Sequence, residues 1–164
     1  MRGNSDPVCP VTELSDADLL QMRSAVAREL KRRGLAGNVG QVAEAHAIAF
    51  YNSTPGRPNL QAAPPGTQNV DALSRKGERY SIKGILDARK TGTIYPDRDD
   101  ADKQLFEYLL IVQIDHDWRL KAIYELEWAT FIEVRSWDRR MNAWYVGLAA
   151  RTLMRALLFR PSDS

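Results

Sequence analysis

The hydrophobic pattern near the start of the chain is that of one amphipathic helix. After an irregular lead over residues 1–14, apolar residues recur at helical spacing and predict a helix over residues 15–34. Its apolar stripe consists of Leu19, Met22, Val26 and Leu30. Ser15 begins a pattern that resembles a capping box, and Gly34 suits the end of the helix. The basic residues near that end are typical of a solvated helix terminus, with a phosphate contact as the alternative.

The next part of the chain passes from a helical to a strand-like pattern. A second helix is predicted from residue 37 to about residue 51, and its alanines allow close packing on a sheet. The connector over residues 52–68 contains four prolines and two glycines, so we expect no regular structure there. Alternating apolar and polar residues then predict a hairpin over residues 70–84, and Gly77 supplies the positive φ that its turn needs.

The second half of the chain supplies further strands and short helices. Strands over residues 105–114 and 119–126 are predicted to pair as a hairpin beside the first one, and the long apolar run of the former suits a central strand. A short helix is expected over residues 128–137. Residues 143–148 fit either a last strand or the start of a helix, and residues 151–159 predict a C-terminal helix.

These elements predict one α/β domain over residues 1–164, with a core over residues 37–158. We expect that core to hold a central mixed sheet of four to five strands flanked by helices. A single cysteine, Cys9, excludes a disulfide framework and a cysteine-rich zinc site. No apolar stretch approaches the roughly 18 residues of a membrane span. The polar N-terminus does not resemble a signal peptide, so we expect a cytoplasmic protein without a membrane partner.

The hairpin over residues 70–84 carries an acid and a lysine that can meet across two strands. Asp71 lies among apolar residues, which is unusual for a solvated strand, and Lys83 lies on the predicted second strand. Such a pair suits a divalent metal and an activated water. A structural salt bridge between the two side chains is the alternative explanation.

Net charge is only +2, so any interaction with nucleic acid depends on where the charges lie. Three segments carry basic or amide side chains suited to phosphates and base edges. The candidates are Arg57, Asn59 and Gln61 in the connector, Arg89 and Lys90 in the polar segment over residues 85–104, and Arg139 and Arg140 in a late turn. Ordinary solvated loop residues are the alternative for all three segments.

The order of these motifs resembles the PD-(D/E)xK nuclease superfamily, which has the restriction-endonuclease-like fold. A helix with Glu44 precedes a Ser-Thr-Pro-Gly loop, an Asp71-Ala strand and an Ile82-Lys-Gly strand. Within the superfamily the chain is similar to a small bacterial branch of restriction-endonuclease-like domains. The resemblance covers roughly residues 37–158, and it rests on the joint order of motifs that are individually short.

The resemblance implies phosphodiester hydrolysis assisted by Mg²⁺ or Mn²⁺. Asp71 and Glu44 would supply carboxylate ligands, and the backbone carbonyl of Ile82 would add a third oxygen. Lys83 would lie near the attacking water and favour its deprotonation. The expected activity is that of a DNA endonuclease of restriction or phage-defence type. Symmetric cutting of both strands would require a homodimer.

One position departs from the motif of this superfamily. Ser81 stands where an aspartate or glutamate is usual, and a neutral hydroxyl is a poor ligand for Mg²⁺. Glu44, or Asp97 from the downstream acidic loop, would have to compensate. The alternatives to an active nuclease are therefore a catalytically degenerate module that binds nucleic acid or protein on the same fold, and an interaction protein without nucleic acid.

Overall fold

The computed structural model describes residues 10–162, which divide into two compact units, one ending at Gly37 and the other beginning at Asn38. The first unit holds a short 3-10 helix, η1 (Val11–Glu13), and helix α1 (Asp16–Arg32). The Ser15 hydroxyl accepts from the backbone N–H of Asp18 at 3.2 Å, and Gly34 has a φ of +70° just beyond α1. These two signals confirm the predicted first helix. The lead predicted over residues 1–14 lies mostly outside the described residues.

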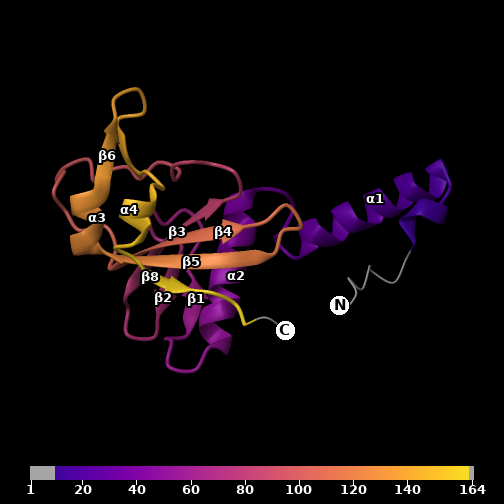
Figure 1. Cartoon of the computed structure of the whole chain (residues 1–164), viewed down its shortest axis with the longest axis horizontal. Coiled ribbons are helices and arrows are strands. Elements are labelled where there is room, and N and C mark those ends of the chain that lie inside the picture. The colour runs from indigo at the N-terminus through magenta and orange to yellow at the C-terminus, as the bar shows by residue number, and fades with distance from the viewer. Residues whose placement is uncertain (1–9, 163–164) are drawn as a thin grey trace. The chain divides into compact units, whose positions relative to one another are not determined.

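The second unit is built on a mixed sheet of six strands in the order β1-β2-β3-β4-β5-β8 (Figure 1). Neighbouring strands are antiparallel except β3 and β4, which are parallel. The strands are β1 (Leu60–Ala62), β2 (Ala72–Ser74), β3 (Arg79–Ile85), β4 (Tyr108–Ile114), β5 (Leu120–Glu127) and β8 (Leu157–Phe159). The α/β class is thereby confirmed, and so are the two predicted hairpins, β2–β3 and β4–β5. Gly77, in the first turn, has the expected positive φ of 81°.

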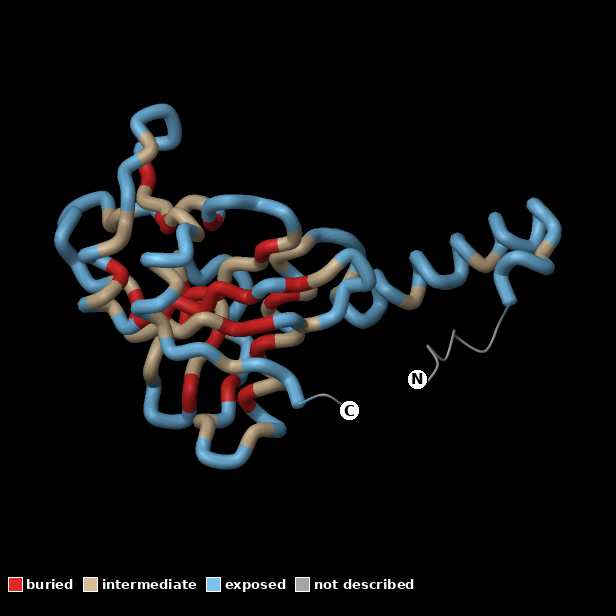
Figure 2. The backbone as a smooth tube through the Cα atoms, viewed as in Figure 1, coloured by how far each residue is buried: buried red, intermediate tan, exposed pale blue. Residues whose placement is uncertain are grey.

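Different elements cover the two faces of this sheet. Helix α2 (Val39–Ser53) packs on one face, where its buried Ala43, Ala47 and Tyr51 join a core with side chains of β3, β4 and β5. A second apolar core lies on the other side and includes Phe131 of α3 (Trp128–Val134) and Val146 of β7 (Ala143–Val146). Buried residues concentrate in the central strands (Figure 2). β7 pairs with β6 (Arg135–Asp138) in a separate hairpin, which extends away from the main sheet (Figure 1).

No helix within residues 10–162 combines the length and apolar character needed to cross a membrane.

Three sequence predictions about secondary structure were wrong. The connector over residues 52–68 contains β1, which forms because its backbone pairs with β2 despite the surrounding prolines. The predicted C-terminal helix is instead the short α4 (Ala150–Leu153) followed by β8, because residues 157–159 complete the edge of β5. The helix expected over residues 128–137 ends at Val134, where β6 begins. The two unforeseen strands raise the sheet from the expected four to five strands to six.

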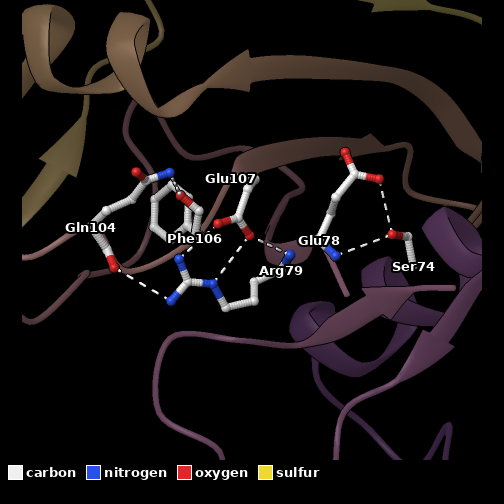
Figure 3. Close-up of polar contacts among 6 residues, drawn as sticks. All are labelled: Ser74, Glu78, Arg79, Gln104, Phe106 and Glu107. Carbon is white, nitrogen blue, oxygen red and sulfur yellow. Dashed lines mark hydrogen bonds and ion pairs between the residues drawn. The ribbon is translucent and has the colours of Figure 1, made fainter. Parts of the chain in front are cut away.

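A partly exposed ion pair joins the start of β3 to the segment that enters β4. The Glu107 carboxylate accepts from the backbone N–H of Arg79 at 2.6 Å and from the Arg79 guanidinium at 2.7 and 3.1 Å (Figure 3). The backbone N–H of Glu107 donates back to the carbonyl of Arg79 at 2.9 Å. The backbone carbonyl of Gln104 accepts a further hydrogen bond from the same guanidinium at 3.4 Å. The pair therefore joins the start of β3 to the segment that enters β4, and it supports their parallel register.

Replacing Glu107 with glutamine is expected to lower the free energy of unfolding at pH 7 by about 1 kcal/mol, because charge-assisted hydrogen bonds at a partly exposed site are lost. The Arg79 hydrogen bonds hold the pKa of Glu107 below its ordinary value of 4.5. Its contribution is therefore fully present above pH 4.5 and declines as pH falls through the lowered folded pKa. Urea unfolding at neutral and at acidic pH should show the difference from wild type shrink with acidity. Glu127→Gln, at an exposed position on β5, serves as the control.

Candidate functional site

Helix α2 is brought unusually close to β3 by a glycine. An added Cβ at Gly84 would lie 2.7 Å from the Ala43 Cβ and 2.7 Å from the backbone oxygen of Val39. Only a residue without a side chain therefore permits this helix-to-strand distance. Glu44 follows Ala43 on α2 and is half-buried, so the same contact sets the position of its carboxylate beside β3.

Asp71 is held at the point where regular pairing of β2 with β3 ends. Its backbone N–H donates to the carbonyl of Tyr80 at 2.8 Å, and its own carbonyl accepts from Ala63 at 2.9 Å. Its carboxylate Oδ2 accepts from the backbone N–H of Ile82 at 2.6 Å. Three hydrogen bonds thus fix a residue that the sequence placed on the strand and that lies immediately before it. The free edge of β3 beyond this point is covered by a carboxylate in place of a neighbouring strand.

The backbone carbonyl of Ile82 faces the same edge as the Asp71 carboxylate. In an extended strand the N–H and C=O of one residue point to the same side, and the N–H of Ile82 points to Asp71. Lys83 comes next on β3 and is half-buried, with its stem beside the segment that contains Gly92. The edge of β3 at Ile82 therefore faces the carboxylate of Asp71, and Lys83 is the next residue of the strand.

The charges of Glu44, Asp71 and Lys83 act on one another. Partial burial raises the pKa of Glu44, and the negative charge of Asp71 raises it further, whereas Lys83 lowers it. The two carboxylates therefore repel each other across the site, and one cation of the chain partly offsets that repulsion. Asp71 and Lys83 therefore both lie near enough to Glu44 to act on the pKa of its carboxyl group.

The donor set fits a hard divalent cation better than a soft one. Within residues 10–162, no group of three or more His, Cys, Asp or Glu side chains is arranged to hold a metal ion. Mg²⁺, however, is commonly held by one or two carboxylates while waters and substrate phosphates complete its shell. Glu44, Asp71 and the Ile82 carbonyl match that requirement, and a cation there would relieve the repulsion between the two acids.

Ser81 lies two residues before Lys83 and is fully buried. Its hydroxyl oxygen has no hydrogen-bond partner among the described residues. An unpaired buried hydroxyl carries a desolvation penalty, so its presence is not explained by stability. In the PD-(D/E)xK motif this position holds an acid. Here it holds a serine whose hydroxyl has no hydrogen-bond partner among the described residues.

Replacing Ser81 with alanine is expected to leave the free energy of unfolding unchanged or to raise it by about 1 kcal/mol, because an unsatisfied hydroxyl is removed. Ser74 is the matched control, since it is also buried but its hydroxyl donates to Glu78 at 3.0 Å and accepts from the Glu78 N–H at 3.2 Å (Figure 3). Ser74→Ala should therefore lose about 1 kcal/mol. Equal losses in urea unfolding of both variants would contradict the unpaired state of Ser81.

Asp97 remains within its own loop. Its carboxylate accepts from the backbone of Asp99 and Asp100 at 3.0 and 3.2 Å and pairs with Lys103 at 3.2 Å. These hydrogen bonds lower its pKa. The hydrogen bonds and the ion pair of the Asp97 carboxylate therefore all lie within residues 97–103.

The basic and amide residues proposed to contact DNA differ in their exposure and in their contacts within the chain. Arg57 stacks over the ring of Phe159 at 4.9 Å and, with Asn59, lines a pocket of about 550 Å³. Gln61 is exposed on β1. Lys90 pairs with Asp138 at 3.4 Å, which ties the polar segment to the β6–β7 hairpin. Arg89 and the hairpin-turn residues Arg139 and Arg140 are exposed.

One polar pair near the sheet was missed by the sequence reasoning. Buried Tyr51 of α2 donates a hydrogen bond to Glu125 of β5, which also lines the 550 Å³ pocket. Burial raises the pKa of Glu125, and the hydrogen bond from Tyr51 opposes that rise. The sequence shows only an acid on the polar side of an alternating strand, a position where a solvated acid is ordinary. Its partner comes from a helix more than 70 residues away, and no local pattern identifies it.

Comparison with protein-family models and with curated protein sequences finds no match to this chain.

Proposed function

We propose that this chain is a metal-dependent DNA endonuclease of restriction or phage-defence type, built on a restriction-endonuclease-like core. The observation that carries the proposal is the hydrogen bond that holds the Asp71 carboxylate at the edge of β3, and the charges of Asp71 and Lys83 that act on half-buried Glu44 support it. A salt bridge alone would not account for the third charge, supplied by a helix whose approach depends on Gly84. Paired acids with a nearby cation suit phosphodiester hydrolysis better than structural pairing.

Each residue has a distinct role in this proposal. Asp71, Glu44 and the Ile82 carbonyl would hold Mg²⁺ or Mn²⁺, which when bound would polarise the scissile phosphate and acidify water. Lys83 would orient the attacking water and stabilise negative charge as it develops. The hydrogen bond from Ile82 fixes the Asp71 carboxylate in advance, so little reorganisation is needed when DNA binds.

The experiment is cleavage of supercoiled plasmid with Mg²⁺ or Mn²⁺, comparing wild type with Asp71→Asn. Asparagine keeps an oxygen that can accept from the Ile82 N–H but removes the charge, so stability should change little. We expect the cleavage rate to fall by on the order of a hundredfold or more, because metal ligation contributes several kcal/mol to such reactions. Asp117→Asn, in the exposed β4–β5 turn, should cut as wild type does.

Two results would oppose the proposal. One is the absence of metal-dependent cutting by the wild-type protein, and the other is equal cutting by wild type and Asp71→Asn.

The second candidate is a module that binds nucleic acid without cutting it. Ser81 favours it, because the motif position lacks a carboxylate and no three acidic, histidine or cysteine side chains within residues 10–162 form a metal group. Binding would then depend steeply on salt through the exposed cations. The candidate phosphate contacts are Arg89, Arg139 and Arg140. The other residues proposed to face DNA are Arg57, Asn59, Gln61 and Lys90. We expect a cytoplasmic homodimer in either case.

A further inference from the structure

Helix α1 carries an apolar stripe that no described residue of its own unit buries. No residue of α1 is buried, and the stripe residues Leu19, Val26 and Leu30 are 38, 51 and 39% exposed. An isolated helix of 17 residues is marginal in water even with good capping. The stripe therefore requires a surface to pack against.

The stripe is long enough, and lies sufficiently along one side of α1, to form the interface between two packed helices. Leu19, Met22, Val26 and Leu30 follow one another at spacings of three and four residues, so they lie along one side of the helix. At 1.5 Å per residue, α1 is about 25 Å long. Spacings of this kind are those by which two helices interlock their side chains.

The first and last turns of α1 carry charges of opposite sign, and Glu29, next to the basic end, pairs with Arg32 and Arg33 within the helix. The first turn contains Asp16 and Asp18, and the last turn contains Lys31 and Arg32, followed by Arg33. Two copies in parallel would place like charges side by side. Two antiparallel copies would place the acidic start of each against the basic end of the other. Their helix dipoles would also be antiparallel, which is the favourable orientation.

We propose that two copies of this chain associate through α1, packed antiparallel along the apolar stripe. Leu19 of one copy then lies opposite Leu30 of the other, with Met22 near Val26 at the centre. Asp16 and Asp18 of each copy face the basic last turn of the other. The interface is independent of the proposed nuclease activity, since it lies outside the unit that holds Glu44, Asp71 and Lys83.

The apolar part of the interface is tested by sedimentation of the full chain over a range of concentrations. Wild type should dimerise reversibly, and Val26→Ser should weaken the dimer by on the order of tenfold or more, because two valine side chains lose their burial. Leu20→Ser is the matched control: Leu20 is also an exposed leucine of α1, at 60%, but it lies off the stripe. A monomeric wild type, or a Val26→Ser dimer as tight as wild type, would overturn the proposal.

The orientation is tested by charge reversal and mixing. Asp16→Lys with Asp18→Lys makes one variant, and Lys31→Glu with Arg33→Glu makes the other. Each alone should be monomeric at concentrations where wild type is dimeric, because like charges then meet at both ends. An equimolar mixture should dimerise again, because each reversed end meets a complementary one.

Circular dichroism of each variant checks that α1 still forms, so that loss of the dimer in a single variant reports on charge and not on unfolding. A mixture that stays monomeric, or a dimer that neither reversal disturbs, overturns the antiparallel arrangement. Plasmid cleavage measured alongside separates this interface from the active site, because Asp71→Asn should abolish cutting while leaving the dimer intact.

Discussion

Lys83→Met is expected to reduce metal-dependent plasmid cleavage by about 10²- to 10⁴-fold, the range contributed by a positioned proton-transfer group. Methionine keeps the unbranched stem that lies beside Gly92 and removes only the ammonium group. The loss should fall on the turnover number, with DNA affinity changed only slightly, because one charge among many is removed. Lys83→Arg should restore little, because a planar guanidinium cannot occupy the position of a compact ammonium.

A second readout follows from the effect of Lys83 on Glu44. Lys83 lowers the pKa of Glu44, so its removal lets burial and Asp71 raise that pKa further. The acidic limb of any remaining pH–rate profile should therefore move to higher pH. Lys121→Met, on an exposed position of β5, is the control for loss of one lysine. Unchanged cleavage by Lys83→Met would remove Lys83 from the catalytic set.

Gly84→Ala is expected to lower the free energy of unfolding by about 2–3 kcal/mol, because one added methyl group overpacks the contact between α2 and β3. Its Cβ would approach both a side-chain carbon and a backbone oxygen at 2.7 Å. Backbone cannot rotate away as a flexible side chain can, so the helix itself must shift. Glu44 would move with it, and cleavage should fall more than stability alone explains.

Two companion variants define the cause of that loss. Ala43→Gly combined with Gly84→Ala removes the clash with the Ala43 Cβ but leaves those with the oxygen and Cγ1 of Val39, so recovery should be partial. Gly147→Ala introduces the same change where no atom lies within 4 Å, and it should be nearly neutral. Urea unfolding of the three variants measures both effects. A Gly84→Ala protein as stable as Gly147→Ala would show that the α2–β3 contact is not restrictive.

Local signals in the sequence predicted the elements whose geometry depends on a few neighbouring residues. The Ser15 cap and Gly34 define α1, and Gly77 defines the turn between β2 and β3. The apolar run of β4 and the alternation of β5 gave their antiparallel pairing. Such features depend on backbone preferences and side-chain periodicity, which a short window of sequence contains.

The two short edge strands, β1 and β8, were beyond local prediction. β1 and β8 each contain three residues, and neither has a strand pattern long enough to recognise. Both exist because an edge of the sheet offers unpaired backbone groups, and that edge forms only in the folded chain. The residues of β8 also fit a helix, so tertiary pairing overrode their local preference.

The sequence by itself determined the α/β class, the first hairpin, and the identity of Glu44, Asp71, Ser81 and Lys83 as a candidate set. Only the tertiary structure decided that Glu44 approaches the other two charges, because that approach depends on a helix packed against Gly84. It also decided that Asp71 bonds to Ile82, that Ser81 is unsatisfied, and that Asp97 stays in its own loop. Residue types and periodicity are encoded locally, whereas distances between remote side chains are fixed only when the core is packed.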